Sequence, residues 1–197
     1  MAQEDHYYEN PANWYPSYPG VKIAKDDRVV LMTDANANGY DIVVEGVLEI
    51  QLGAILSSSD GNLIIKAGGL LDNDGSVFVK ELTNYGQVYN RQSAEINIHE
   101  YIAHTGAQTH NSYSATFTTI KTLVNEGRFD NYGHCKIEQT LTNVAVFNQI
   151  NRSELEVAGD LQLLPGCTFN QSQKSTLSVK SSAHKVAFQD RLMEMFQ

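Results

Sequence analysis

The chain has 197 residues, of which 42% are hydrophobic and 19% charged, and its formal net charge is −9. This length can bury the core of a single domain. The acidic balance argues against nucleic acid or an anionic membrane surface as the main partner, because both require a basic footprint. The sequence has no apolar run near the roughly 20 residues that a membrane span needs. We therefore expect no nucleic acid partner and no membrane span.

The first segment, residues 1–20, is rich in aromatic residues and proline. Trp14, Tyr15 and Tyr18 are its candidate binding residues. Their rings combine a broad apolar face with a polar edge, which suits stacking on a sugar or anchoring a protein partner. The same rings could instead pack over the start of the domain as an N-terminal cap, so both interpretations stay open.

Residues 21–180 contain a recurring motif: leucine, any residue, asparagine, any residue, glycine, then an apolar residue two positions later. Copies begin at Leu71, Leu82 and Leu123, with worn copies at Phe129 and Leu141. A leucine between polar neighbours points inward on a strand, and asparagine and glycine both accept left-handed backbone. We therefore expect corners where the asparagine bonds backbone, the glycine lies at or next to positive φ, and stacked asparagines bond along the axis. On this interpretation Asn84→Asp should be nearly neutral for folding.

The spacing of the leucines indicates coils of about 20 residues. Leu63 and Leu82 are 19 residues apart, and Leu123, Leu141 and Leu161 follow at 18 and 20. In a β-helix each coil covers the apolar face of the next, which requires such a period with short strands. An antiparallel sandwich also has short strands but does not need repeated corners. The sequence thus predicts an all-β fold, a single-stranded parallel β-helix that is right-handed, with these leucines and Leu71 buried in one core.

Two segments depart from the repeat. Residues 99–115 have few apolar positions, which predicts a loop thrown out of one coil. Residues 181–197 lack glycine and proline, which predicts a short helix that begins near Ser181. That helix would lay Leu192 and Phe196 over an open edge of the solenoid. The expected organisation is therefore an aromatic segment or cap at 1–20, a solenoid at 21–180 and a capping helix at 181–197.

Two groups of residues raise the question of metal binding. His99, Glu100, His104 and His110 lie in one segment, but their spacing fits no known ligand motif. Oxygen ligands near glycine, at Asp72, Asn73, Asp74, Asp130 and Asn131, suggest Ca²⁺, but the patterns of calcium loops are missing. Solvated histidines and Asn-Gly corners explain both groups, so we expect no metal and no cofactor.

Carbohydrate chemistry is the enzymatic alternative. Polysaccharide-degrading β-helices carry carboxylates and a basic residue on one solvent face. The candidates here are Glu95, Asp130 and Glu138 with Arg128 and Lys136. These residues form no recognisable motif, and charged residues on outward strand positions are usual on a solvated face. We therefore expect no catalytic residues.

Cys135 and Cys167 lack the spacing of a metal-binding pair. A disulfide between them would close a loop of about 33 residues and contribute roughly 3–4 kcal/mol. The interpretation as two small buried thiols is favoured over the disulfide.

The chain resembles the β-helical surface proteins with Asn/Gly repeats that Bacteroidetes-type bacteria export. The resemblance rests on Asn10-Pro11-Ala12-Asn13-Trp14, on Pro19-Gly20 before Asp26-Asp27-Arg28-Val29-Val30-Leu31, and on the repeated corner. It covers about residues 10–170 and implies export to the cell surface or medium and an adhesin-like or scaffold role, without catalytic residues. Those proteins are usually longer and often end in a sorting domain, so the chain could be a piece of one.

The sequence therefore predicts a non-enzymatic structural or adhesive module, secreted or displayed on a cell surface. Its flat faces would bind a protein or glycan surface, or further copies of itself. The alternative is a carbohydrate-binding or carbohydrate-active β-helix.

Overall fold

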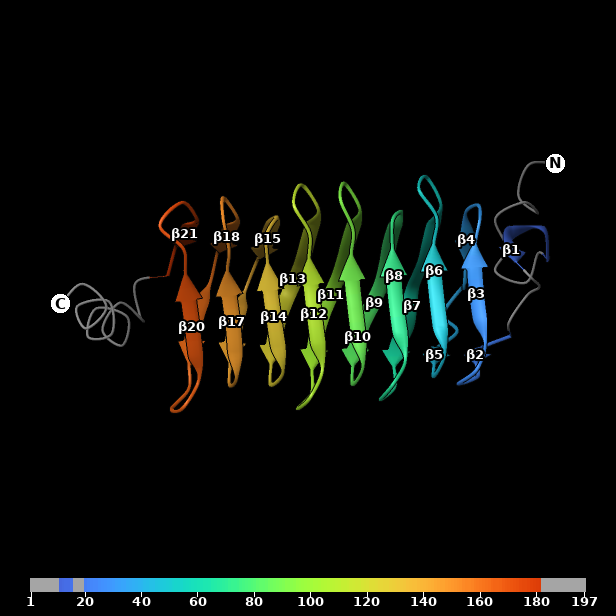
Figure 1. Cartoon of the computed structure of the whole chain (residues 1–197), viewed down its shortest axis with the longest axis horizontal. Coiled ribbons are helices and arrows are strands. Elements are labelled where there is room, and N and C mark those ends of the chain that lie inside the picture. The colour runs from blue at the N-terminus through green and yellow to red at the C-terminus, as the bar shows by residue number, and fades with distance from the viewer. Residues whose placement is uncertain (1–10, 16–19, 182–197) are drawn as a thin grey trace.

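Successive coils of the chain stack into a parallel β-solenoid of about eight turns. The computed structural model describes residues 11–15 and 20–181. The coils follow one another in a single elongated row, so residues near the two ends of the described chain lie far apart (Figure 1). The predicted all-β parallel solenoid is confirmed.

Two sheets run along this row. Sheet B contains β1 (Trp14–Tyr15), β3 (Arg28–Leu31), β6 (Val47–Ile50), β8 (Leu70–Asn73), β10 (Gln87–Asn90), β12 (Gln108–Asn111), β14 (Arg128–Asn131), β17 (Val146–Gln149) and β20 (Thr168–Gln171). Sheet A contains β2 (Lys22–Ile23), β4 (Ala35–Asn36), β5 (Ile42–Val44), β7 (Ile55–Ile65), β9 (Ser76–Asn84), β11 (Glu95–Ala103), β13 (Thr116–Asn125), β15 (His134–Ile137), β16 (Thr140–Asn143), β18 (Glu154–Val157), β19 (Asp160–Leu163) and β21 (Thr176–Val179). Apart from β1, each described strand pairs parallel with its neighbours, which contradicts a sandwich of hairpins.

Sheet A turns a corner of its own, so each complete coil has three sides. The register of β7 with β9 shifts between Ser58 and Asn62, where the strand bends from one side to the next. In the last coils the two halves are separate strands, such as β15 and β16. We call the three outer surfaces face B (sheet B), face A1 (β15, β18, β21 and the first halves of the long strands) and face A2 (β5, β16, β19 and the second halves).

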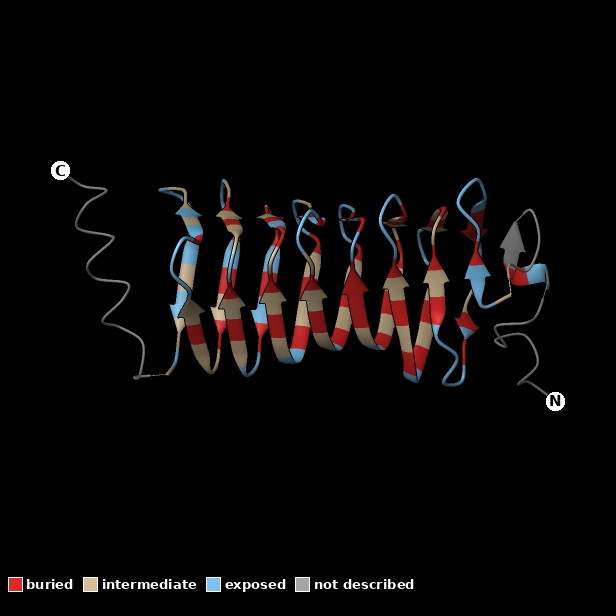
Figure 2. Ribbon diagram, turned by 90° about the horizontal axis from the view of Figure 1, so that it is seen from below, coloured by how far each residue is buried: buried red, intermediate tan, exposed pale blue. Residues whose placement is uncertain are grey.

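The core is built from columns of like residues, one from each coil. Residues along most strands alternate between buried and partly exposed, as the banding in Figure 2 shows. Leu82, Leu123, Leu141 and Leu161 are buried and stack in register, with Tyr101 between the first two. Leu71 is buried in a second column. The predicted burial of these leucines is confirmed.

The coils differ in length because their corners differ. Equivalent strands of sheet B begin 17 to 23 residues apart. Long corners are four-residue turns such as Lys66–Gly69, in which the amide of Gly69 donates to the carbonyl of Lys66 at 2.8 Å. Short corners are two residues, such as Tyr85-Gly86. The strands stay in register because the extra residues are accommodated in the turns.

The expected reason for the motif glycines is wrong. Positive φ occurs at glycines of the long turns, such as Gly68, and not at Gly75, Gly86, Gly127 or Gly133. A Cβ on any of these four would approach backbone carbonyl oxygens of the preceding coil's four-residue turn more closely than 3.0 Å. The motif therefore requires glycine at these four corners because two backbones pack against each other.

Asparagines of successive coils, including Asn73 and Asn131 of the motif, form a ladder as the sequence predicts, but inside the core. Asn73, Asn90, Asn111 and Asn131 are buried, and the side-chain amide of each donates to the side-chain oxygen of the next at 2.8–3.0 Å, ending on Gln149. Each amide also donates to a backbone carbonyl of the following coil, as Asn111 does to His134 at 3.0 Å. Burial of these amide N–H groups is tolerated because they are hydrogen-bonded.

The segment 99–115 is not a loop outside the coil. It contains most of β11 and all of β12, which pair in register with β9, β13, β10 and β14. Its inward positions hold polar or small residues: Thr109 hydrogen-bonds to Tyr101, and Ala103 and Ala107 are buried. The low apolar content therefore reflects a polar cluster in the core.

The N-terminal segment closes one end of sheet B. Strand β1 pairs antiparallel with β3, following the short helix η1 (Pro11–Asn13). Buried Asn13 donates to the carbonyl of Asp34 at 2.9 Å and accepts from the hydroxyl of Thr33 at 2.8 Å. The backbone of Trp14 and Tyr15 thus forms the edge strand of sheet B, and the packing of their rings over the first coil stays a prediction. Tyr18 lies outside the described residues.

At the other end, the inward residues of the last described coil are less covered than their equivalents one coil earlier. Phe169, Leu177 and Val179 are only partly buried but pack against the core. The predicted helix of residues 181–197 lies outside the described residues except for Ser181, and the structure gives it no support.

Glycines of the short corners and glycines of the long turns should respond differently to substitution by asparagine, because asparagine accepts positive φ but carries a Cβ. Gly86→Asn should lower the free energy of unfolding by about 1–3 kcal/mol, because the Cβ overpacks the corner. Gly68→Asn should change it by less than about 1 kcal/mol, because φ is +84° and the space is open. Urea unfolding of both variants tests this. Equal tolerance at the two positions would contradict the packing explanation.

The predicted neutrality of Asn84→Asp is not compatible with the contacts of Asn84. Its buried amide donates to the phenol oxygen of Tyr101 at 3.2 Å and to the carbonyl of Gln108 at 3.1 Å. An aspartate would bring a charged acceptor against these oxygens, so we expect a loss of about 3 kcal/mol or more at neutral pH. The loss should shrink as the pH falls, because protonation removes the charge. Urea unfolding at several pH values, with Asn97→Asp on face A1 as the control, measures it; equal stability of the two variants would contradict this.

Candidate functional site

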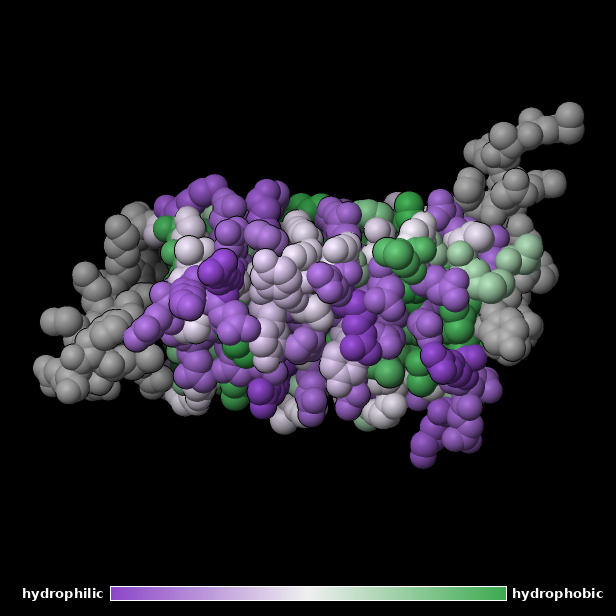
Figure 3. Space-filling view, turned by 45° about the horizontal axis from the view of Figure 1, so that its top comes forward, coloured by the Kyte–Doolittle hydropathy of each residue, from purple (hydrophilic) through white to green (hydrophobic). Residues whose placement is uncertain are grey.

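The three outer faces carry different chemistry. The central column of face A2 is largely apolar and β-branched: Val43, Ile64, Thr83, Ile102, Val124, Thr142 and Gln162. The central column of face B is polar and aromatic: Glu49, Asp72, Tyr89, His110, Asp130, Asn148 and Asn170. We call this second set the polar column and treat it as the candidate site. The view in Figure 3 is mostly hydrophilic, with hydrophobic residues in separate patches.

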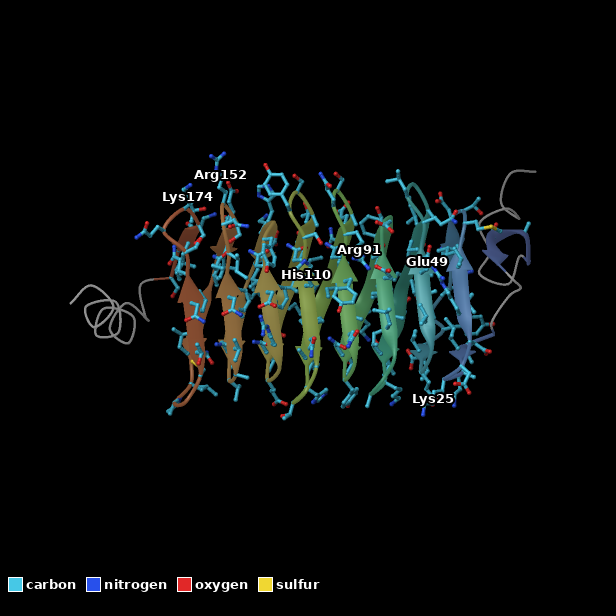
Figure 4. All side chains as sticks on the ribbon, in the orientation of Figure 1. Lys25, Glu49, Arg91, His110, Arg152 and Lys174 are labelled. Atoms are coloured by element: carbon cyan, nitrogen blue, oxygen red, sulfur yellow. The ribbon has the colours of Figure 1, made fainter. Side chains whose placement is uncertain are left out.

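The fold alone brings the polar column together. Each member is the third residue of its four-residue strand, where the alternation along the strand points the side chain outward. In-register pairing then places each member directly beside the equivalent residue of the next coil, as Tyr89 lies beside His110. Glu49, Arg91 and His110 are labelled along this sheet in Figure 4.

The N-terminal part of the column is a network of ion pairs. Arg28 pairs with Glu49, and Arg91 binds Asp72 through both Nε and Nη2, the latter at 2.9 Å. The hydrogen bond to Asp72 raises the pKa of Arg91. Burial, and then the charge of Asp72, raise the pKa of the neighbouring Asp74, while Arg91 lowers it. These carboxylates are thus held in place by cations from adjacent coils.

The middle of the column is aromatic. The guanidinium of Arg91 lies 4.9 Å from the centre of the Tyr89 ring, and Tyr89 and His110 make an edge contact at 6.0 Å. His110 also packs against Tyr132, with the ring centres 4.7 Å apart. Such contacts orient the rings while leaving part of each exposed.

The C-terminal part of the column is an outer ladder of amides. Asn170 donates to Asn148 at 2.7 Å, and Asn148 donates to Asp130 at 2.6 Å. Arg128 donates to the other oxygen of Asp130 at 2.8 Å. The carboxylate and both amides are therefore fixed relative to one another across three coils.

A smaller aromatic cluster lies at the corner between face A2 and face B. Tyr85 and His104 stack in parallel, with ring centres 4.1 Å apart. Lys66 lies over Tyr85 at 5.5 Å, and Nδ1 of His104 is 3.5 Å from Glu126. This cluster spans four coils at one corner, whereas the polar column spans seven coils of a flat face.

The structure does not bring the predicted catalytic candidates together. Arg128 and Asp130 pair on face B, whereas Lys136 and Glu138 pair at 3.0 Å on face A1, which also carries Glu95. The five candidates of the enzymatic alternative therefore do not form one site.

The three histidines considered as metal ligands also lie at different places in the coil. His99 lies where β11 bends between the two A faces, His104 lies at the corner beyond that strand, and His110 lies on face B. Within residues 11–15 and 20–181, no group of three histidine, cysteine or acidic side chains could hold a metal ion.

Cys135 and Cys167 are buried, and no disulfide joins them in this structure. Burial raises the pKa of the Cys135 thiol. The thiol therefore stays neutral and serves as a small core residue.

Sequence reasoning identified Asp72 and Asp130 for another role and missed Tyr89, Arg91 and Tyr132. These residues lie side by side because the strands pair in register although the coils differ in length. A fixed sequence period does not predict that pairing. Trp14 and Tyr15, the predicted binding residues, belong to β1 at the end of sheet B, next to β3.

No protein-family model matches the chain, and no curated protein or solved structure matches it significantly. Among the described residues, no helix has the length and apolar character needed to cross a membrane.

The protonation of His110 offers a test of the column's geometry. Its pKa is lowered from the ordinary value of 6.5, mainly by burial; Asp130 raises it and Arg91 lowers it. NMR titration should give a midpoint below 6.5, lower still in Asp130→Asn and higher in Arg91→Gln. The folded state binds this proton more weakly than the unfolded state. His110 should therefore lower the free energy of unfolding as the pH falls below 6.5, the ordinary pKa of histidine. A midpoint that rises in Asp130→Asn would contradict the contact.

Proposed function

We propose that this protein is a non-enzymatic structural or adhesive module that binds its partner through the polar column. The observation that supports this proposal is the continuity of the column, which presents carboxylate, aromatic and amide groups in register over seven coils. The resemblance to exported β-helical surface proteins supports placing this activity outside the cell or on its surface.

The column suits recognition because its side chains are ordered before a partner arrives. Asp130 is held by Arg128 and Asn148, and Tyr89 by Arg91 and His110. Binding to side chains that are already fixed costs less conformational entropy than binding to mobile ones. A rigid solenoid adds to this, because its strands are anchored in a common core.

The column also suits adhesion because its chemistry is repeated along a line. Weak contacts made by successive coils to an extended partner act together, as linked sites do in multivalent binding. An adhesive function therefore needs no deep pocket.

The proposal is tested by retention of the purified protein on surfaces coated with collagen, fibronectin or plant and bacterial polysaccharides. On a coating that retains the wild type, Tyr89→Ala with Asn148→Ala should weaken retention about tenfold or more, as loss of anchor residues does. Asn97→Ala with Lys136→Ala on face A1 should leave it unchanged.

Equal loss in both double variants would contradict the assignment to face B. Depolymerisation of any coating polysaccharide by the protein would contradict the non-enzymatic function.

A further inference from the structure

We infer that the polar column binds a neutral, linear polysaccharide that lies along the solenoid axis. This rests on the proposed function, since it names the partner of the same face. The column is a line of planar polar and aromatic side chains, and the inference follows from its charge, its hydrogen-bonding capacity and its direction.

The charges along the column nearly balance. Four carboxylates face three guanidinium groups: Glu49, Asp72, Asp74 and Asp130 with Arg28, Arg91 and Arg128. Because these groups already neutralise one another, a polyanion gains little from the arginines and meets a protein of net charge −9. The face therefore favours a partner that contributes hydroxyl groups and no charge.

Hydrogen-bonding capacity remains at the ladder of amides. Asn148 uses one N–H on Asp130 and accepts one bond from Asn170, and an amide nitrogen has a second N–H to donate. The planar amide and carboxylate groups can bond to neighbouring hydroxyls of a sugar ring. The exposed part of Tyr89 and Tyr132 offers apolar contact to its C–H face.

The direction of the column selects a chain over a single sugar. Adjacent members are one strand spacing apart, about 4.8 Å, so the six steps from Glu49 to Asn170 extend over roughly 29 Å. A monosaccharide touches one or two members, whereas an extended oligosaccharide touches one coil after another. Affinity should therefore rise with chain length until the ligand spans the column.

The test is calorimetric titration of the full chain with oligosaccharides from disaccharide to octasaccharide, derived from neutral glucan, xylan and mannan. Polygalacturonate is the anionic comparison. For at least one neutral series we expect affinity to rise with chain length. Tyr89→Ala and Asn170→Ala should each lower the affinity for the octasaccharide about tenfold. Asn97→Ala on face A1 is the matched control and should bind as the wild type does.

Preference for the anionic polymer, affinity that is independent of length, or equal loss in the control would overturn the inference. So would the absence of binding to all three neutral series. In that last case, retention on protein coatings that still depends on Tyr89 and Asn148 would leave the proposed function standing, whereas loss of that dependence would reject both.

Discussion

In-register hydrogen bonding between successive coils is the constraint on which the rest of this structure depends. Each strand of a middle coil has a parallel neighbour on both sides, so its backbone groups are satisfied only if every coil repeats the path of the last. That repetition brings like positions together. Leucine then covers leucine and asparagine donates to asparagine, as in the column through Leu123 and Leu141 and the pair Asn125 and Asn143.

The same constraint that builds the core also builds the outer surface. Asn111 and His110 are adjacent in β12, yet one extends the buried amide ladder and the other the outward-facing polar column. A change in register by one residue would exchange the two, burying the ring and exposing the amide. The function proposed for face B is therefore tied directly to the register that holds the fold together.

The sequence predicts features that depend on residue type, such as the stacked leucines, better than features that depend on how closely two coils approach. Leucine spacing identified the solenoid, because stacking in the core demands an apolar residue in every coil. The explanation for Gly86 was wrong, since glycine avoids a clash with another coil there, and sequence cannot show such close approach. The prediction of a loop around Tyr101 and Thr109 is wrong because the polar residues there include a buried hydrogen-bonded pair. The polar column was missed because its members share no residue type, only a register.

Distances measured between spin labels on face A1 test the stacking most directly. Ser57, Lys136 and Ser178 lie in one outward column, with Lys136 four coil steps from Ser57 and Ser178 six steps from it. Pulsed EPR on labelled cysteine pairs should give narrow distributions near 19 Å for the first pair and 29 Å for the second, since each step is about 4.8 Å. Distances that do not grow with the number of coils between the labels would contradict a solenoid stacked in register.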